Sequence, residues 1–270
     1  MSRYREGFTL LELLVSMALI GIVMAALFNF FSQTSSVSAQ SSSRAELQQE
    51  VLTAQQLIAG KLKEAWYIYP AGTVITLGGS GTNNTRKNPV ATSNPQSWTT
   101  GTDPILAMIL PPMTSGGAYR FYAYYPVLRS VWVGATGGTS APTSSNPGSD
   151  AVNDGSTWVL AEYRASLTLT STTPFPSTPP PVPTTGDANL LTDYIAPSNA
   201  AGNTYTMFST LTPVSLSTPP AGSATSYVPG VTLSLATTRN TGGRVLRLPN
   251  ATDEYDLTVY PTNLGKIAAN

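Results

Sequence analysis

The sequence predicts an α+β protein in which a long amino-terminal helix, made of a membrane span and an amphipathic stem, packs on an antiparallel β-sheet head. Three observations favour this fold. An apolar run extends from Phe8 to Phe31, no proline interrupts the chain before Pro70, and the remainder alternates β-rich runs with loops rich in Gly, Ser, Thr, Asn and Pro. These features are typical of a membrane helix, a continuous stem and the strands of a sheet, respectively.

The run from Phe8 to Phe31 is long enough to span a membrane. At a rise of about 1.5 Å per residue, a helix of this length covers a hydrocarbon core of roughly 30 Å. Its polar side chains are Thr9, Glu12, Ser16 and Asn29, and among them Glu12 alone carries a charge. Because a charged residue inside such a helix costs about 3 kcal/mol to insert, Glu12 requires a compensating partner.

The residues before this run indicate how the chain is oriented. Residues 1–7 are polar and contain Arg3 and Arg5, so the amino end is expected to stay in the cytoplasm while the rest is exported. A secretory signal has its small cleavage-site residue after the apolar core. Here the small residue, Gly7, comes before the core, which is the reverse order.

The order Gly7, Phe8 and then Glu12, five places after the glycine, resembles the class III leader of type IV prepilins and of type II secretion pseudopilins. The resemblance implies that prepilin peptidase cuts between Gly7 and Phe8 and methylates the new amine of Phe8. It also implies that Glu12 faces the terminal amine of a neighbouring subunit during assembly. The alternative, an ordinary signal anchor with an incidental glutamate, leaves both features as coincidences, and we reject it.

The same resemblance implies where the protein resides and what it contacts. We expect a single-pass protein of the bacterial inner membrane, with its head exported, that then enters a filament in the periplasm or at the cell surface. The implied partners are other pilins or pseudopilins, prepilin peptidase, the inner-membrane assembly platform and membrane lipid. The predicted division is a leader over residues 1–7, a transmembrane helix over 8–31, a helical stem over 32–69 and a β-rich head over 70–270.

The stem is predicted from a helical stripe of apolar residues. Between Leu47 and Ala65, apolar side chains recur at spacings of three, four and seven, so one face of the helix is expected to be buried. Pro70 is expected to end the helix at about Tyr69. The glycines Gly21 and Gly60 are weak points, because glycine costs about 1 kcal/mol relative to alanine in a helix.

The head is predicted to be an antiparallel sheet. In the run 157–170 the residues Glu162, Arg164 and Ser166 alternate with apolar residues, so we expect that strand to be exposed on one face. A proline-rich segment over 174–183 is expected to be extended, as a stiff connector or a partner-binding segment. The candidate strands cover residues 73–77, 105–110, 119–125, 128–133, 157–170, 205–211, 231–237, 245–248 and 257–260.

Composition argues against an enzyme. The chain contains no cysteine and no histidine, which excludes disulfides, cysteine nucleophiles, zinc sites built from these residues and any Ser-His-Asp triad. No cofactor is expected. Charged residues make up 10% of the chain and the formal net charge is zero, so bulk electrostatics will not drive binding to nucleic acid.

Within the prepilin family the order of features looks most like the PilW-like minor pilins and the J-type minor pseudopilins. Many major pilins close a loop with a disulfide, which this chain cannot form. The resemblance therefore implies a minor pilin or pseudopilin, a structural subunit of a type IV pilus-like filament that serves pilus biogenesis, type II secretion or DNA uptake. The alternatives are a surface-displayed DNA-binding or adhesion receptor with the same anchor, and a membrane-tethered hydrolase.

Three further groups of residues invite a functional interpretation. Oxygen-bearing side chains that could bind calcium occur in two groups, although neither has EF-hand spacing and a solvated turn is the simpler interpretation. Late arginines could contact DNA phosphates, or simply be surface charge. An aromatic run from Tyr119 to Trp132 is either a sugar- or partner-binding surface or core packing. The calcium candidates are Asp253, Glu254 and Asp256 in one group and Asp150 and Asp154 in the other, and the arginines are Arg239, Arg244 and Arg247.

Overall fold

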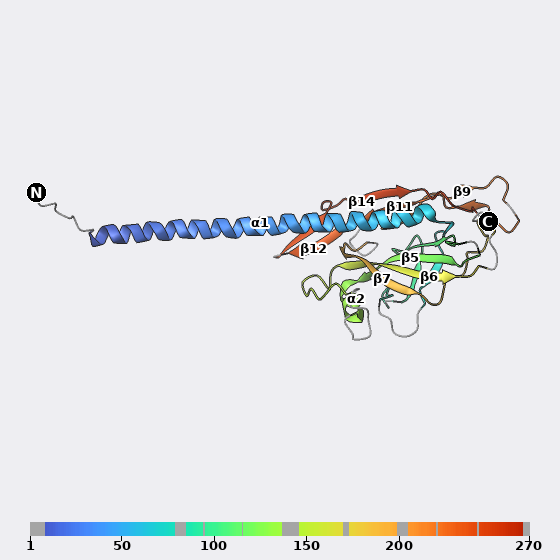
Figure 1. Ribbon diagram of the computed structural model, residues 1–270, viewed down its shortest axis with the longest axis horizontal. Coiled ribbons are helices and arrows are strands. Elements are labelled where there is room, and N and C mark those ends of the chain that lie inside the picture. Colours follow the sequence, from blue (N-terminus) through green and yellow to red (C-terminus); the bar gives the residue numbers. More distant parts are fainter. Residues whose placement is uncertain are drawn as a thin grey trace, which may run out of the picture. The chain divides into compact units, whose positions relative to one another are not determined.

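The computed structural model describes residues 9–78, 85–93, 95–114, 116–136, 146–169, 173–198, 205–219, 221–241 and 243–266. Gly7 and Phe8, the predicted cleavage residues, lie outside the described residues. The chain divides into two compact units, Met1–Glu46 and Leu47–Asn270. The first contains the amino-terminal part of helix α1 (Leu10–Glu64), and the second contains the rest of that helix and all the strands that the structure describes (Figure 1).

Helix α1 begins at Leu10 and ends at Glu64, five residues before the predicted end at Tyr69. It ends early because the following backbone joins a sheet. The amides of Trp66 and Tyr69 donate to the carbonyls of Ile109 and Ala107, at 2.8 and 3.1 Å. Hydrogen bonding of residues 66–69 to β4 (Leu106–Leu110) therefore ends the helix at Glu64, before Pro70 is reached.

The strands form one large and one small antiparallel sheet, with two short strand pairs beside them. In spatial order the large sheet contains β1 (Tyr67–Ile68), β4 (Leu106–Leu110), β5 (Tyr119–Leu128), β6 (Trp158–Leu167), β7 (Asp187–Ile195), β12 (Thr237–Thr241) and β13 (Arg244–Leu248). The small sheet contains β14 (Tyr255–Val259), β11 (Val231–Leu235) and β8 (Phe208–Thr210). The short pairs are β2 (Val74–Thr76) with β3 (Ser97–Thr99), and β9 (Val214–Ser215) with β10 (Ser226–Tyr227).

The large sheet has a hydrophobic core on each face. On one face, Ile58 and Leu62 of α1 pack in the same cluster as Tyr124 of β5 and Leu233 of β11. Alternate residues of the same strands point to the other face, where the core contains Trp98, Phe121, Trp132 and Tyr163. The predicted α+β architecture, a long helix packed on an antiparallel sheet, is confirmed. The aromatic run lies in these cores, since the relative exposure of its rings from Tyr119 to Trp132 does not exceed 8%.

One sequence prediction for the head was right in part and another was wrong. Strand β6 was expected to expose one face, and Arg164 and Ser166 are exposed on it, but Glu162 is only 4% exposed and accepts a hydrogen bond from the Tyr124 hydroxyl at 2.8 Å. The segment 128–133 was expected to be a strand, yet it forms most of helix α2 (Arg129–Thr136). The first two amides of that helix donate to the carbonyls of Thr157 and Asp154. This cap, together with burial of Trp132, outweighs the β propensity of the segment.

Candidate functional site

Helix α1 starts with a capping box formed by Thr9 and Glu12. The backbone amide and the hydroxyl of Thr9 each donate to Glu12 Oε2 at 3.0 Å, and the Glu12 amide donates to Thr9 Oγ1 at 3.3 Å. Reciprocal bonds of this kind satisfy amides that have no partner within the helix. Glu12 is therefore held at the first turn of the helix by the residue that directly follows Phe8 in the sequence.

The carboxylate of Glu12 lies within an apolar helical surface. Leu10, Leu11 and Leu13 are 84%, 72% and 57% exposed, and buried residues of α1 begin only at Leu47. Within the described part of the chain, α1 is the one helix that is long and apolar enough to cross a membrane, judged by length and composition. The acidic side chain therefore interrupts a surface that is otherwise suited to hydrocarbon.

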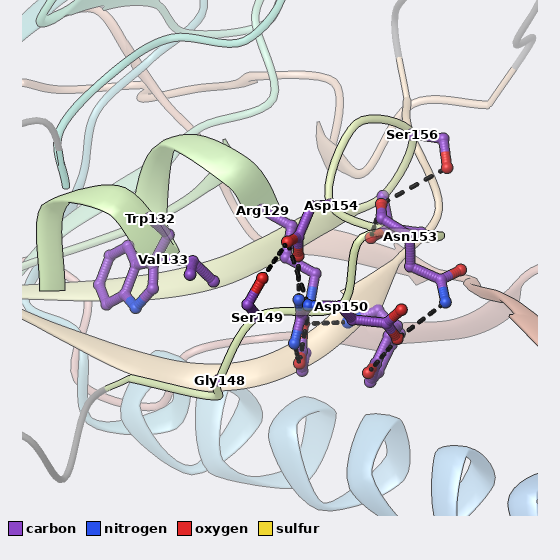
Figure 2. Close-up of polar contacts among 12 residues, drawn as sticks. Arg129, Trp132, Val133, Gly148, Ser149, Asp150, Asn153, Asp154 and Ser156 are labelled. Atoms are coloured by element: carbon purple, nitrogen blue, oxygen red, sulfur yellow. Dashed lines mark hydrogen bonds and ion pairs between the residues drawn. The ribbon is translucent and has the colours of Figure 1, made fainter. Parts of the chain in front are cut away.

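The calcium candidates Asp150 and Asp154 belong to a network around the buried side chain of Arg129, which is 1% exposed (Figure 2). Its guanidinium forms ion pairs with Asp154 and with Asp193, the latter through Nε and Oδ1 at 2.9 Å. Burial disfavours the charged guanidinium, but its hydrogen bonds to Asp193 and Asp154 and the Coulomb attraction of Asp193 outweigh this effect and raise the pKa of Arg129. The Arg129 guanidinium therefore occupies the position beside Asp154 where a calcium ion would have to bind.

Tyr194 and Asn153 extend this network across β7 and β12. The Tyr194 hydroxyl donates to Asp150 Oδ2 at 2.9 Å, and the guanidinium carbons of Arg129 and Arg239 lie 4.8 and 4.5 Å from the centre of its ring. Burial, together with the hydrogen bond to Asp150, raises the pKa of Tyr194 to about 12. Asn153 pairs with the backbone of Asn240 through both side-chain atoms, at 3.0 and 2.6 Å. The turn 150–157 is therefore attached to the sheet on two sides.

Two of the other calcium candidates, Asp253 and Glu254, lie in a turn organised by Arg247. Its guanidinium donates to the carbonyls of Asn250 and Asp253 at 2.8 Å and forms an ion pair with Glu254 at 2.8 Å. Asp256 is exposed on β14. Within the described ranges, no group of three or more acidic side chains is placed to hold a metal ion.

The three arginines that could contact DNA do not form one surface. Strands β12 and β13 pair with Arg239 opposite Leu246, Thr241 opposite Arg244 and Thr238 opposite Arg247. Since directly opposed residues share a face and neighbours along a strand alternate, Arg239 and Arg244 lie on one face and Arg247 on the other. A single phosphate-binding patch cannot include all three.

Sequence reasoning missed Thr9 and the Arg129 network for different reasons. The spacing of Thr9 and Glu12 is the capping-box pattern and was readable from the sequence. The partners of Arg129, Asp154 and Asp193, are 25 and 64 positions away along the chain. No local pattern connects these residues, so only the fold brings them together.

Comparison with known proteins adds one finding. Residues 2–28 match the family model of the prokaryotic N-terminal methylation motif, which covers Gly7, Phe8, Thr9 and Glu12. The searches of curated proteins and of solved structures gave no match. The motif, the capping box and the apolar helix agree with one another, and the amino-terminal segment of this chain therefore carries the class III leader of type IV pilin-like and pseudopilin precursors.

Proposed function

We propose that the protein is a minor pilin or pseudopilin, a structural subunit of a type IV pilus-like filament used in pilus biogenesis, type II secretion or DNA uptake. The methylation motif over residues 2–28 is the observation that carries this proposal. The apolar first part of α1 and the helix-on-sheet head support it. The lack of cysteine, which rules out the disulfide of many major pilins, favours a minor subunit similar to the PilW-like or J-type proteins.

Processing follows from the leader. Prepilin peptidase cuts between Gly7 and Phe8 on the cytoplasmic side, where Arg3 and Arg5 hold the amino end, and methylates the amine of Phe8. Gly7→Leu adds bulk at the scissile bond, so the precursor should keep its leader. Intact-mass measurement of membrane fractions distinguishes the two forms. A wild-type protein that retains Arg3 and Arg5 in cells with active peptidase would contradict this step.

Assembly then depends on Glu12. After cleavage the Phe8 amine is a cation at the start of the apolar run, and Glu12 is the one charged side chain within that run. Attraction between them, within one subunit or between neighbours, is stronger in a low-dielectric filament core than in water. If the carboxylate is removed, the buried amine loses its counter-ion, which costs about 3 to 5 kcal/mol.

The test compares wild type, Glu12→Leu and Glu12→Gln for membrane level and for co-purification with other filament subunits. Leucine removes the cost of placing a carboxylate in hydrocarbon, so the membrane level should be unchanged or higher. Co-purification should fall in both variants, because both leave the amine unpaired. Glu46→Gln, on an exposed part of the same helix, is the matched control and should behave as wild type. Equal co-purification of all variants at matched membrane levels would refute charge pairing.

A further inference from the structure

An open hollow of about 520 Å³ lies where β5 begins, β6 ends and β7 begins, at the opposite ends of these strands from the network around Arg129. Its lining includes Arg120, Tyr122, Arg164, Ser166, Thr185 and Asp187, and we call it the Arg120–Arg164 hollow. Arg164 lies opposite Tyr122 across the β5–β6 ladder and opposite Asp187 across the β6–β7 ladder. These side chains therefore form one row across three strands.

The positive charges in this region come from three elements. Lys61 of α1 and Arg164 of β6 lie 5.7 and 5.8 Å from the centre of the Tyr122 ring. The Arg164 side chain is 58% exposed, whereas its ion-pair partner Glu162 is 5% exposed, so the carboxylate lies below and the guanidinium reaches solvent. Arg120 contacts Glu64 at 3.4 Å, longer than the roughly 2.7–2.9 Å of a strong charge-assisted hydrogen bond. Arg120 also donates through Nε to the Pro111 carbonyl at 3.2 Å. With five N–H donors each, both guanidinium groups can still donate through their terminal nitrogens to another anionic partner.

The balance of charge decides what kind of anion fits. Lys61, Arg120 and Arg164 are offset by the carboxylates of Glu64, Glu162 and Asp187, so the hollow has no surplus charge to attract a polyanion from a distance. Asp187 at its edge would repel the closely spaced phosphates of a nucleic acid. Recognition here must instead be short-range, through the planar fork of arginine, which matches a carboxylate in two-point contact.

The remaining polar groups of the lining match hydroxyl groups. Ser166 and Thr185 can both donate and accept hydrogen bonds, and the Asp187 carboxylate accepts them. Pockets of about 300–1,000 Å³ are typical for small ligands, and 520 Å³ lies within that range. We propose that the Arg120–Arg164 hollow binds an acidic sugar, a uronate whose carboxylate is held by the two arginines and whose hydroxyls bond to Ser166, Thr185 and Asp187.

The experiment uses the full chain in detergent micelles and titrates methyl galacturonate, which carries one carboxylate, by calorimetry. Wild type should bind it saturably and should not bind the neutral methyl galactoside. Arg164→Gln should weaken binding at least tenfold, and Arg164→Lys should also weaken it, because lysine keeps the charge but lacks the fork. Arg120→Gln tests the second guanidinium without exposing Glu162. Arg244→Gln, an exposed arginine on β13, is the matched control and should bind as wild type.

Three results would overturn the proposal. The first is that wild type shows no saturable binding at millimolar methyl galacturonate. The second is that inorganic phosphate or duplex DNA binds as tightly as the uronate, which would make the hollow a general anion site. The third is that Arg164→Lys, or both glutamine variants with an unchanged melting temperature, bind as wild type does, which would exclude two-point recognition.

Discussion

Replacing Arg129 with methionine should destabilise the head more than any exposed substitution, because it leaves two carboxylates without their cation. The side chains of Arg129, Asp154 and Asp193 are 1%, 16% and 12% exposed, so water screens the group poorly. Removing one partner of such a buried network costs about 3 to 5 kcal/mol. For a domain of this size, 1 kcal/mol shifts the melting temperature by about 2–4 °C, so the expected decrease is roughly 6–20 °C.

The assay is thermal unfolding of the full chain in detergent, followed by tryptophan fluorescence, since Trp132 lies buried on α2 beside Arg129. Arg120→Met breaks an ion pair whose partner, Glu64, is 48% exposed, and serves as the control with an expected loss below about 1 kcal/mol. Adding Asp154→Asn and Asp193→Asn to Arg129→Met should recover part of the loss. Equal melting temperatures for Arg129→Met and Arg120→Met would refute the argument from burial.

Further outcomes follow from individual contacts. Gly60→Ala should stabilise the head by about 1 kcal/mol and raise its melting temperature, because a Cβ at Gly60 meets no atom within 4 Å; a decrease would show that this face of α1 is packed. Partial burial opposes ionisation of Asp150, but hydrogen bonds from Asn153 and Tyr194 outweigh it and lower its pKa. The carboxylate of Asp150 binds a proton less readily in the native state than in the unfolded state, so its contribution to folding stability is present above a pH of about 4 and is lost as the pH falls further. Asp150→Asn should flatten that part of the acid denaturation curve. An unchanged curve would contradict the role of Asp150 in this pH dependence. Deleting residues 1–34 removes no side chain that is buried in the described part of the chain, so the remaining head should be soluble without detergent and should melt at the same temperature as the full chain. Extending the deletion through Val51, which is 0% exposed, should lower the melting temperature sharply.

The fold class was predictable because the signals for α1 and for the main strands are local. An apolar run followed by the stripe from Leu47 to Ala65 specifies a helix with one buried face, continuous runs of apolar and aromatic residues favour the fully buried strands β4 and β5, and alternation specifies β11. The errors arose where tertiary contacts override local preference. Segment 128–133 became α2 because carbonyls of residues 154 and 157 cap it, and β7 was missed because polar residues alternate irregularly along it.

The functional residues at the amino-terminus were predictable from the sequence, whereas those of the Arg120–Arg164 hollow were not. Gly7, Phe8 and Glu12 belong to a contiguous motif, which the match over residues 2–28 includes. The row from Tyr122 through Arg164 to Asp187 exists only because two strand registers place these residues opposite one another. A register shift of one residue would move Arg164 to the other face, so no reading of the sequence without the sheet pairing could identify that hollow.

The capping box affects the energetics of the proposed pairing between Glu12 and a terminal amine. In the chain itself the carboxylate already accepts two hydrogen bonds, from the amide and the hydroxyl of Thr9. Both donors would remain after the proposed cleavage between residues 7 and 8, so Glu12 would be partly compensated before any assembly. Pairing with an amine would therefore add only the difference between the interaction energy of Glu12 with a full positive charge and its interaction energy with the two neutral donors of Thr9. That difference grows as the surroundings become less polar, so the cap should lower the cost of insertion, and the proposed charge pair should favour the assembled state.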